Sequence, residues 1–443
     1  MPTRVRSYSK INLGLAIGPA RADGFHGLTT LYQTLALHDV VTVGARQLAP
    51  GERSEAQGSR VDGERAGAEQ NRITLTTNHP DVPTDSRNTA WKMVQWALAR
   101  MGVAAEVSIH IQKELPVQGG LGAGSANAAA ALIGLERELG MALPGPERLA
   151  LAAEVGSDVP LFLIGGAVLG TGRGEQVAAM PDLPRTWCVV AVPEMRVSTP
   201  RAFQEWDERQ GTGNRGQGSE SRERGAGAGG QDAGRGNGEG GRGSLIPDPC
   251  SLPSGLTSPV ETDRLKELSR VIASVLGVLE FSVNPAAEQT SDTSGIVHGR
   301  QGISSSETKQ GGLEEQRFTS EQGAQNGLAE NTLLALVRTG IENDFEQVVF
   351  PQYPLLREIK HELMGPPADG VSMGMVPDPA RPDDSSGNAL YAALSGSGSA
   401  LFGLYRSERD ARAAQQRVQA FGCKAMVTET LPRAEYWATM FAE

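Results

Sequence analysis

The sequence predicts an α+β fold in two parts, an N-terminal half over residues 1–183 and a C-terminal half over residues 184–443. Residues 106–112 alternate polar and apolar side chains, as a half-buried strand does, and lead through a glycine-rich turn into an alanine-rich helix. Residues 88–101 carry apolar side chains at helical spacing. A short apolar strand over residues 188–192 then begins the second half. Strands and helices are therefore mixed along the chain.

The sequence predicts further strands and helices in both halves. Residues 7–43 are rich in strand-forming residues, with Asp23 and Gly24 at a hairpin turn, and residues 72–76 resume a strand. Residues 165–174 are predicted as a strand and a glycine turn. Helices are expected over residues 88–101, 128–139, 146–155 and 355–364.

Polar segments interrupt this pattern at about residues 49–70, 205–260, 286–326 and 366–387. Such compositions bury too little apolar surface to offset the entropy of ordering, so we expect solvated, disordered insertions. Residues 262–279, between two of them, keep helical periodicity. An RNA-binding role for the Arg/Gly-rich residues 211–244 is the alternative interpretation. The arginines there are interleaved with acids, and no aromatic side chain offers a stacking platform, so we favour a solvated segment.

The composition excludes several classes of protein. The 443 residues carry a net charge of −11, which argues against a general binder of nucleic acid or membrane surfaces. The cysteines Cys188, Cys250 and Cys423 lie too far apart for a disulfide framework or a metal knuckle, and we expect no metal site built by the protein alone. No stretch has the length of a membrane span or the apolar core of a signal peptide. A cytoplasmic protein is the expectation.

The glycine-rich turn over residues 116–127 is the most informative segment. Glycines let backbone N–H groups approach an anion, and the start of the following helix adds its dipole and unpaired donors. The turn predicts a phosphate-binding loop. It is not a P-loop, because no Gly-Lys-Ser/Thr closes it, and its glycine spacing differs from the dinucleotide fingerprint. A flexible glycine linker is the alternative, but regular elements on both sides argue against it.

Four motifs, which follow one another along the chain in the family's order, resemble those of the GHMP small-molecule kinases. The loop over residues 116–127 resembles their central motif, and residues 156–162 resemble their Gly-Ala-Asp-Val-Pro-Phe-Phe element. Residues 9–13 and 21–26 resemble the opening motif of those members that act on a cytidyl substrate, and residues 394–402 resemble the closing glycine motif. The resemblance covers most of the chain outside its polar segments. It implies a two-domain fold with a ribosomal S5 domain 2-like N-terminal half and a ferredoxin-like C-terminal half.

The resemblance also implies an activity, the ATP-dependent phosphorylation of the 2-hydroxyl of 4-diphosphocytidyl-2-C-methyl-D-erythritol in non-mevalonate isoprenoid synthesis, with Mg²⁺. Expected partners are this small molecule and ATP, without nucleic acid or membrane, and the expected state is a monomer or weak homodimer. Two alternatives stay open: another GHMP kinase, for homoserine, mevalonate or a sugar, and a non-catalytic binding protein on the same fold. The residues expected to contact ATP are Lys113, Pro116, Gly119, Gly120, Leu121, Gly122, Ala123, Gly124 and Ser125.

Asp158 and Lys10 are the candidate catalytic residues. The resemblance implies that Asp158 accepts the proton of the substrate hydroxyl, and a nearby cation from Lys10 would keep the carboxylate ionised and neutralise developing charge. Without the resemblance, Asp158 could cap the next helical segment and Lys10 could be an exposed charge on a strand edge.

A cytidine-bearing substrate needs an aromatic face and a polar group that reads the base edge. The resemblance implies that Asn12, Phe25, His26 and Phe203 bind it, although Phe25 stands where the family usually has Tyr. Without the family, Phe25 and Phe203 would be read as core residues. Three loop residues also depart from the family pattern: Gln118, Ala123 and Ala126.

Overall fold

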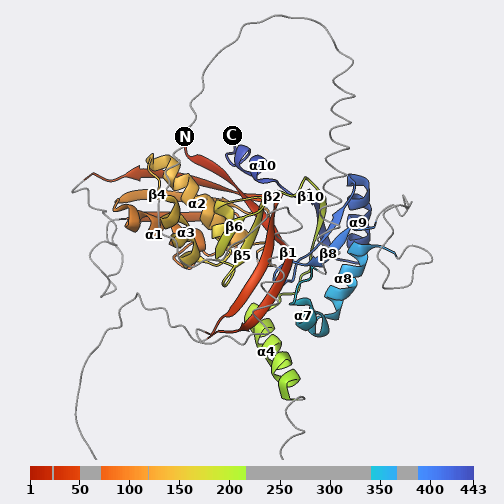
Figure 1. Cartoon of the computed structure of the whole chain (residues 1–443). Coiled ribbons are helices and arrows are strands. Elements are labelled where there is room, and N and C mark those ends of the chain that lie inside the picture. Colours follow the sequence, from red (N-terminus) through yellow and green to blue (C-terminus); the bar gives the residue numbers. More distant parts are fainter. Residues whose placement is uncertain (22–23, 50–70, 118, 216–340, 367–387) are drawn as a thin grey trace, which may run out of the picture.

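The computed structural model describes residues 1–21, 24–49, 71–117, 119–215, 341–366 and 388–443 (Figure 1). The polar segment predicted over residues 286–326 and the helix predicted over 262–279 lie outside the described residues, as do nearly all of 49–70 and 366–387. None of the helices in the described ranges is long and apolar enough to span a bilayer.

A six-stranded sheet forms the centre of the N-terminal half. Its strands are β1 (Thr3–Ala20), β2 (His26–Gln47), β3 (Arg72–Thr77), β4 (Ala105–Gln112), β5 (Ala167–Thr171) and β6 (Gln176–Ala179). The order is β3-β4-β2-β5-β6, and β1 pairs with β2 as a long antiparallel hairpin. Its register shifts between Tyr8 and Lys10 and again between Asn12 and Gly14. Such irregularities re-aim side chains, and both lie beside the predicted catalytic lysine.

Three helices pack with this sheet: α1 (Thr89–Met101), α2 (Ala123–Leu139) and α3 (Gly145–Val155). The predicted apolar face of α1 is confirmed, because Met93, Val94 and Leu98 are buried. The helix expected from residue 128 starts already at Ala123, since Gly122 takes the left-handed turn (φ 71°) and every following residue can be helical. Ala123 is therefore well suited to its position, where the backbone is helical.

The C-terminal half contains a four-stranded antiparallel sheet of β7 (Trp187–Val192), β8 (Tyr391–Leu394), β9 (Leu401–Tyr405) and β10 (Lys424–Glu429). The spatial order of the strands is β10-β7-β9-β8. If the four strands are numbered by their order along the chain, this spatial order is 4-1-3-2. Helices stand between the first two strands and between the last two, which confirms the ferredoxin-like arrangement. These helices are α4 (Thr199–Arg215), α7 (Glu346–Gln352), α8 (Pro354–Met364) and α9 (Glu408–Ala420).

The start of one predicted insertion differs from the structure. The insertion predicted from residue 205 does not begin there, because α4 continues to Arg215. Ala202 and Trp206 are buried on one side of α4. This tertiary packing stabilises the helix although most of its other residues are polar.

The chain end also crosses the predicted boundary between the halves. After β10 it returns to the N-terminal half, where α10 (Arg433–Ala438) packs and the Tyr436 hydroxyl donates to the Phe162 carbonyl at 2.6 Å. Backbone atoms of Arg6 and Met440 are hydrogen bonded, so the two termini lie side by side (Figure 1).

Candidate active site

The glycine loop is a folded connection held against the closing glycine motif. Gly119, Gly120 and Gly122 have positive φ values of 112°, 85° and 71°, which favour glycine. A Cβ at Gly120 would collide with the carbonyl oxygen of Ser395. The Ser395 hydroxyl donates to the Gly120 carbonyl at 3.0 Å. The interpretation of this segment as a flexible linker is therefore wrong.

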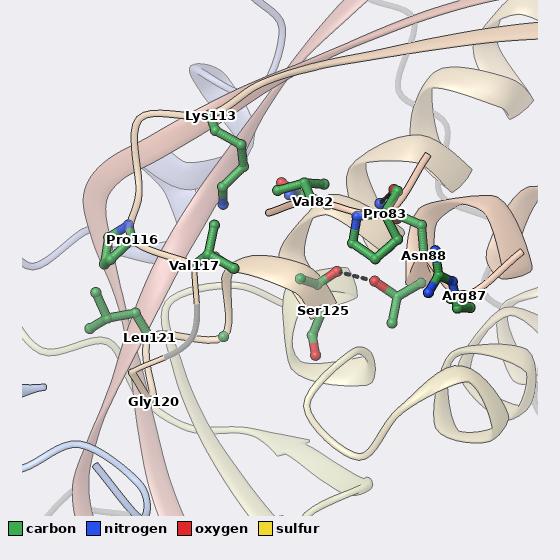
Figure 2. Close-up of a pocket in the computed structure, with 15 residues that line it drawn as sticks. Val82, Pro83, Arg87, Asn88, Lys113, Pro116, Val117, Gly120, Leu121 and Ser125 are labelled. Carbon is green, nitrogen blue, oxygen red and sulfur yellow. Dashed lines mark hydrogen bonds between the residues drawn. The ribbon is translucent and has the colours of Figure 1, made fainter. Parts of the chain in front are cut away.

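A pocket of about 340 Å³ lies over this loop. Val82 and Pro83 lie across it from Pro116 and Val117 (Figure 2). The first turn of α2 has no side-chain cap, so its amide donors are open to an anion. Of the residues predicted to contact ATP, all but Gly119 line the pocket. Sequence reasoning missed the other lining residues, which are Val82, Pro83, Arg87, Asn88, Thr89, Val117 and Asn127.

Lys113 lines this pocket, but its charge is already paired. Its Nζ lies 2.6 Å from Oδ2 of Asp39, and both side chains are buried. Oδ1 of Asp39 accepts the backbone N–H groups of Glu114 and Leu115, each at 2.8 Å. Lys113 therefore fixes the segment that leads into the glycine loop, rather than offering a free cation to a phosphate.

Lys10 and Asp158 meet beside the loop. Nζ of Lys10 lies 3.3 Å from Oδ2 of Asp158 and donates to Oδ1 of Asn12 at 2.7 Å. Lys10 is buried, which excludes an exposed edge charge, while Asp158 is 31% exposed and can meet a ligand. The short helix η1 (Pro160–Leu163) begins after Val159 without a side-chain cap, so Asp158 does not cap it. A Cβ at Gly122 would lie 3.1 Å from Cγ of Lys10, which places the loop against this pair.

Tyr32 is a site residue that sequence reasoning missed. It is buried on β2, directly across from Asn12, and its hydroxyl donates to Oδ1 of Asp158 at 3.0 Å. Burial raises the pKa of Tyr32 well above its usual value, and the negative charge of Asp158 adds to this effect. Tyr32 therefore stays protonated and remains a donor. Gly170 and Gly174 make room for this side chain, since a Cβ at Gly170 would lie 2.5 Å from its ring and a Cβ at Gly174 would lie 2.6 Å from its hydroxyl oxygen.

The closing motif completes this end of the site. Gly396 has a φ of 59°, and a Cβ there would lie 3.7 Å from Nζ of Lys10 and 3.5 Å from Oδ1 of Asn12. The side chain of Asn343 donates to the carbonyl oxygens of Leu394 and Gly396, at 2.8 and 2.7 Å. The motifs at both ends of the chain thus converge on the glycine loop.

Comparison with known families agrees with this geometry. Residues 88–166, which contain the glycine loop and Asp158, match the GHMP kinases N terminal domain, and residues 384–423, with the closing motif, match GHMP kinases C terminal. Two separate segments of the chain thus resemble the two domains of the GHMP kinases.

Curated proteins similar to this chain are named 4-diphosphocytidyl-2-C-methyl-D-erythritol kinase. The protein of Salinispora arenicola (strain CNS-205) is 37% identical over 213 residues, which are 48% of this chain and 61% of that protein. The protein of Nocardia farcinica (strain IFM 10152) is 41% identical over 216 residues, 48% of this chain and 62% of that protein. The aligned part of the chain thus spans about three fifths of the length of these relatives.

Solved structures support the GHMP kinase fold. The crystal structure of a 4-(cytidine 5'-diphospho)-2C-methyl-D-erythritol kinase superposes with a TM-score of 0.50 at 20% identity, covering 97% of this chain and 99% of that chain. A homoserine kinase from Cytophaga hutchinsonii superposes with a TM-score of 0.52 at 15% identity, covering 97% and 95%. At these identities the likeness concerns the fold alone.

Three of the residues expected to bind a cytidyl group, Phe25, His26 and Phe203, lie around the hairpin end of β1 and β2, whereas Asn12 lies beside Lys10. His26 is buried, and the ring of Phe203 stacks on it with centroids 4.9 Å apart. Because stacked rings at this distance are in contact, His26 and Phe203 do not enclose a base between them in this structure. Phe25 is 52% exposed, and the guanidinium of Arg173 lies 5.0 Å from the centre of its ring.

A Mg²⁺ ion in a protein is held mainly by oxygen ligands. The described ranges hold no group of three or more His, Cys, Asp or Glu side chains suited to a metal ion. The Ser125 hydroxyl lies close to Gly156, since a Cβ there would be 3.9 Å from Oγ. Asp158 follows two residues later. One hydroxyl and one carboxylate fit a Mg²⁺ ion that keeps most of its bonds to water and phosphate oxygens.

Proposed function

We propose that this GHMP kinase transfers the γ-phosphoryl group of ATP to the 2-hydroxyl of 4-diphosphocytidyl-2-C-methyl-D-erythritol. The observation that carries the proposal is the pair of Lys10 and Asp158, 3.3 Å apart beside a glycine loop at the start of a helix. A cation, a carboxylate and a phosphate cradle in one place are what phosphoryl transfer to an alcohol requires. The names of the curated relatives support the choice of alcohol.

Nucleotide binding is assigned to the pocket over the glycine loop. The apolar side chains of Val82, Pro83 and Val117 suit an adenine ring, and the loop beside them suits its phosphates. Ser125, in the first turn of α2, places a hydroxyl on the phosphate side and is the proposed protein ligand of Mg²⁺, together with Asp158. When bound, Mg²⁺ supplies charge neutralisation to the phosphate oxygens.

The catalytic steps assigned to the chain are a proton transfer and charge stabilisation. The carboxylate of Asp158 accepts the hydroxyl proton as the oxygen attacks phosphorus. The ammonium of Lys10, fixed by Asn12 and Asp158, neutralises charge that develops on the transferred group. Amide groups of the loop hold the remaining phosphates in line. The burial of Lys10 keeps water away from this cation and strengthens its effect.

An ATP-consumption assay against a panel of alcohols tests the proposal. The panel contains the cytidyl substrate, its uridyl analogue, homoserine, mevalonate and a sugar. We expect turnover with the cytidyl substrate far above that with the others, and a product phosphorylated on the 2-hydroxyl. Preferred turnover of another alcohol would contradict the proposed substrate, but the proposal of a kinase activity would stand. A protein that binds ATP but phosphorylates none of them would support the non-catalytic alternative.

A further inference from the structure

Three side chains of α10 donate hydrogen bonds to the backbone that leaves η1. Together they are the C-terminal clamp, which consists of Arg433, Tyr436 and Trp437. The hydroxyl of Tyr436 donates to the carbonyl oxygen of Phe162 at 2.6 Å, and Nε1 of Trp437 donates to that of Ile164 at 2.9 Å. The last carbonyl groups of a helical turn have no partner within it. The clamp therefore satisfies the end of η1 from outside.

Two glycines directly after η1 make room for the clamp. Gly165 and Gly166 have positive φ values of 74° and 70°. A Cβ at Gly165 would collide with the ring of Tyr436, and a Cβ at Gly166 would lie 2.8 Å from the backbone nitrogen of Arg433. Nε of Arg433 also donates to the carbonyl oxygen of Gly165 at 3.1 Å. The close approach of α10 to this turn thus depends on both glycines.

The backbone that the clamp contacts is continuous with the turn that carries Asp158. The amide of Val159 donates to the carbonyl oxygen of Gly156 at 3.0 Å, and the amide of Phe162 donates to that of Val159 at 3.2 Å. Asp158 lies inside the first of these turns. A displacement of η1 is therefore passed to the backbone of Asp158 through consecutive hydrogen bonds.

The clamp lies outside the proposed nucleotide site. None of its three residues lines the pocket over the glycine loop. In Figure 1, α10 lies away from α8 and α9, beside the N-terminal half. Tyr436 is buried, and this burial raises the pKa of its hydroxyl, which therefore stays protonated and remains a donor. Any effect of the clamp on the site must pass through η1.

We propose that the C-terminal clamp positions Asp158 for proton transfer, with Tyr436 as its central positioning residue. The proposal rests on the proposed function, because Asp158 is the base assigned there. A base must stay within hydrogen-bond reach of the hydroxyl that it deprotonates, and a small displacement costs a large part of the rate. The hydroxyl of Tyr436 fixes η1, and the turn before η1 places the carboxylate 3.3 Å from Nζ of Lys10.

The kinetic test compares the full chain with its Tyr436→Phe variant, which loses one hydroxyl and keeps the ring. We expect kcat for the cytidyl substrate to fall about tenfold, because the carboxylate is less often in place. An interaction that serves only the transition state lowers kcat and leaves KM unchanged. The KM values for ATP and for the cytidyl substrate should therefore stay close to those of the parent.

Tyr405→Phe is the matched control. Tyr405 is also buried, and its hydroxyl donates to the carbonyl oxygen of Leu363 at 2.8 Å within the C-terminal half. Both variants remove a buried hydroxyl from a backbone carbonyl group, so both should lower Tm by similar amounts. Only Tyr436→Phe should lower kcat at a temperature where both variants are folded. An unchanged kcat in Tyr436→Phe, or equal losses in the two variants, would overturn the positioning role.

Hydrogen exchange followed by mass spectrometry tests the clamp without turnover. We expect the amides of residues 159–165 to exchange about fivefold faster or more in Tyr436→Phe than in the parent, since η1 opens more often. Tyr405→Phe should leave exchange in this segment unchanged. Equal exchange in Tyr436→Phe and the parent would overturn the inference. An inactive parent whose segment still responds to Tyr436→Phe would overturn the proposed function and support the contact between the clamp and the turn of Asp158.

Discussion

The hydroxyl of Tyr32 donates a hydrogen bond of 3.0 Å to Oδ1 of Asp158, while Nζ of Lys10 lies 3.3 Å from Oδ2 of the same carboxylate. One oxygen thus faces a neutral donor and the other a cation. Such two-sided support fixes the plane of the carboxylate and the lone pairs that remain for a substrate hydroxyl. In the proposed mechanism, the geometry around Asp158 depends on three side chains rather than on the two predicted from the sequence.

Asp158→Asn should abolish most phosphoryl transfer. The amide cannot accept the hydroxyl proton, and a positioned base contributes about 10²–10⁴-fold to the rate. We expect kcat to fall by this factor while the Kd for ATP, measured without Mg²⁺, stays nearly the same. Glu154→Gln is the control, because Glu154 is an exposed residue of α3. Its Oε1 lies 2.6 Å from Nη2 of Arg100. Turnover of the Asn variant near that of the parent would remove Asp158 from the mechanism.

Tyr32→Phe should lower kcat about tenfold without a matching change in either KM. Hydrogen bonds to charged groups contribute about 1.5–3 kcal/mol, and each 1.4 kcal/mol corresponds to a factor of ten. Because burial keeps the pKa of Tyr32 well above 10, its ionisation should cause no loss of activity below pH 10. Tyr8→Phe is the control, as Tyr8 is equally buried and its hydroxyl bonds Thr439 instead. Equal kcat losses in both variants would point to a general loss of stability.

Gly122→Ala should raise the KM for ATP strongly. Gly122 has a φ of 71°, and a Cβ there would lie 3.0 Å from Phe162 and 3.1 Å from Lys10, so the loop must shift. Gly140 is a matched control, because its φ is 63° and an added Cβ meets nothing within 4 Å. Gly140→Ala should cost about 1 kcal/mol in unfolding free energy and leave ATP binding unchanged. If both variants bind ATP as the parent does, the loop does not hold the phosphates closely.

Features that short-range sequence patterns determine were predicted correctly, whereas features that tertiary packing determines were missed. The glycine loop, the face of α1 and the hairpin of β1 and β2 follow from short-range patterns, and the structure confirms them. Tyr32 was missed because the register shifts near Lys10 and Asn12 decide which residues of β2 face the site. The length of α4 depends on the burial of Trp206 in tertiary packing, which polar composition does not reveal.

Long-range contacts explain the remaining differences. The family resemblance brought Lys10 and Asp158 together as candidates, and the structure places them in contact. Lys113 was expected to contact ATP, and no local pattern predicts that a carboxylate from β2 would pair with it. The return of the chain end to the N-terminal half also arises from packing, through Tyr436.

Variants of Asp39 and Lys113 should distinguish a support for the loop from a phosphate contact. Asp39→Asn keeps an oxygen for the backbone amides of Glu114 and Leu115 but leaves the buried ammonium of Lys113 unpaired. Breaking a buried pair in this way typically costs about 3–5 kcal/mol. We therefore expect a large loss of unfolding free energy in denaturant titrations and a higher KM for ATP.

The double variant Asp39→Asn with Lys113→Met removes the unpaired charge as well. Because apolar replacement of one ion restores a satisfied interior, most of the lost stability should return. The KM for ATP should then return toward that of the parent, since Lys113 acts by holding the entry to the loop. A double variant that unfolds like the parent but still binds ATP poorly would mean that the Lys113 ammonium itself contacts the nucleotide, in line with the expectation from the sequence that Lys113 contacts ATP.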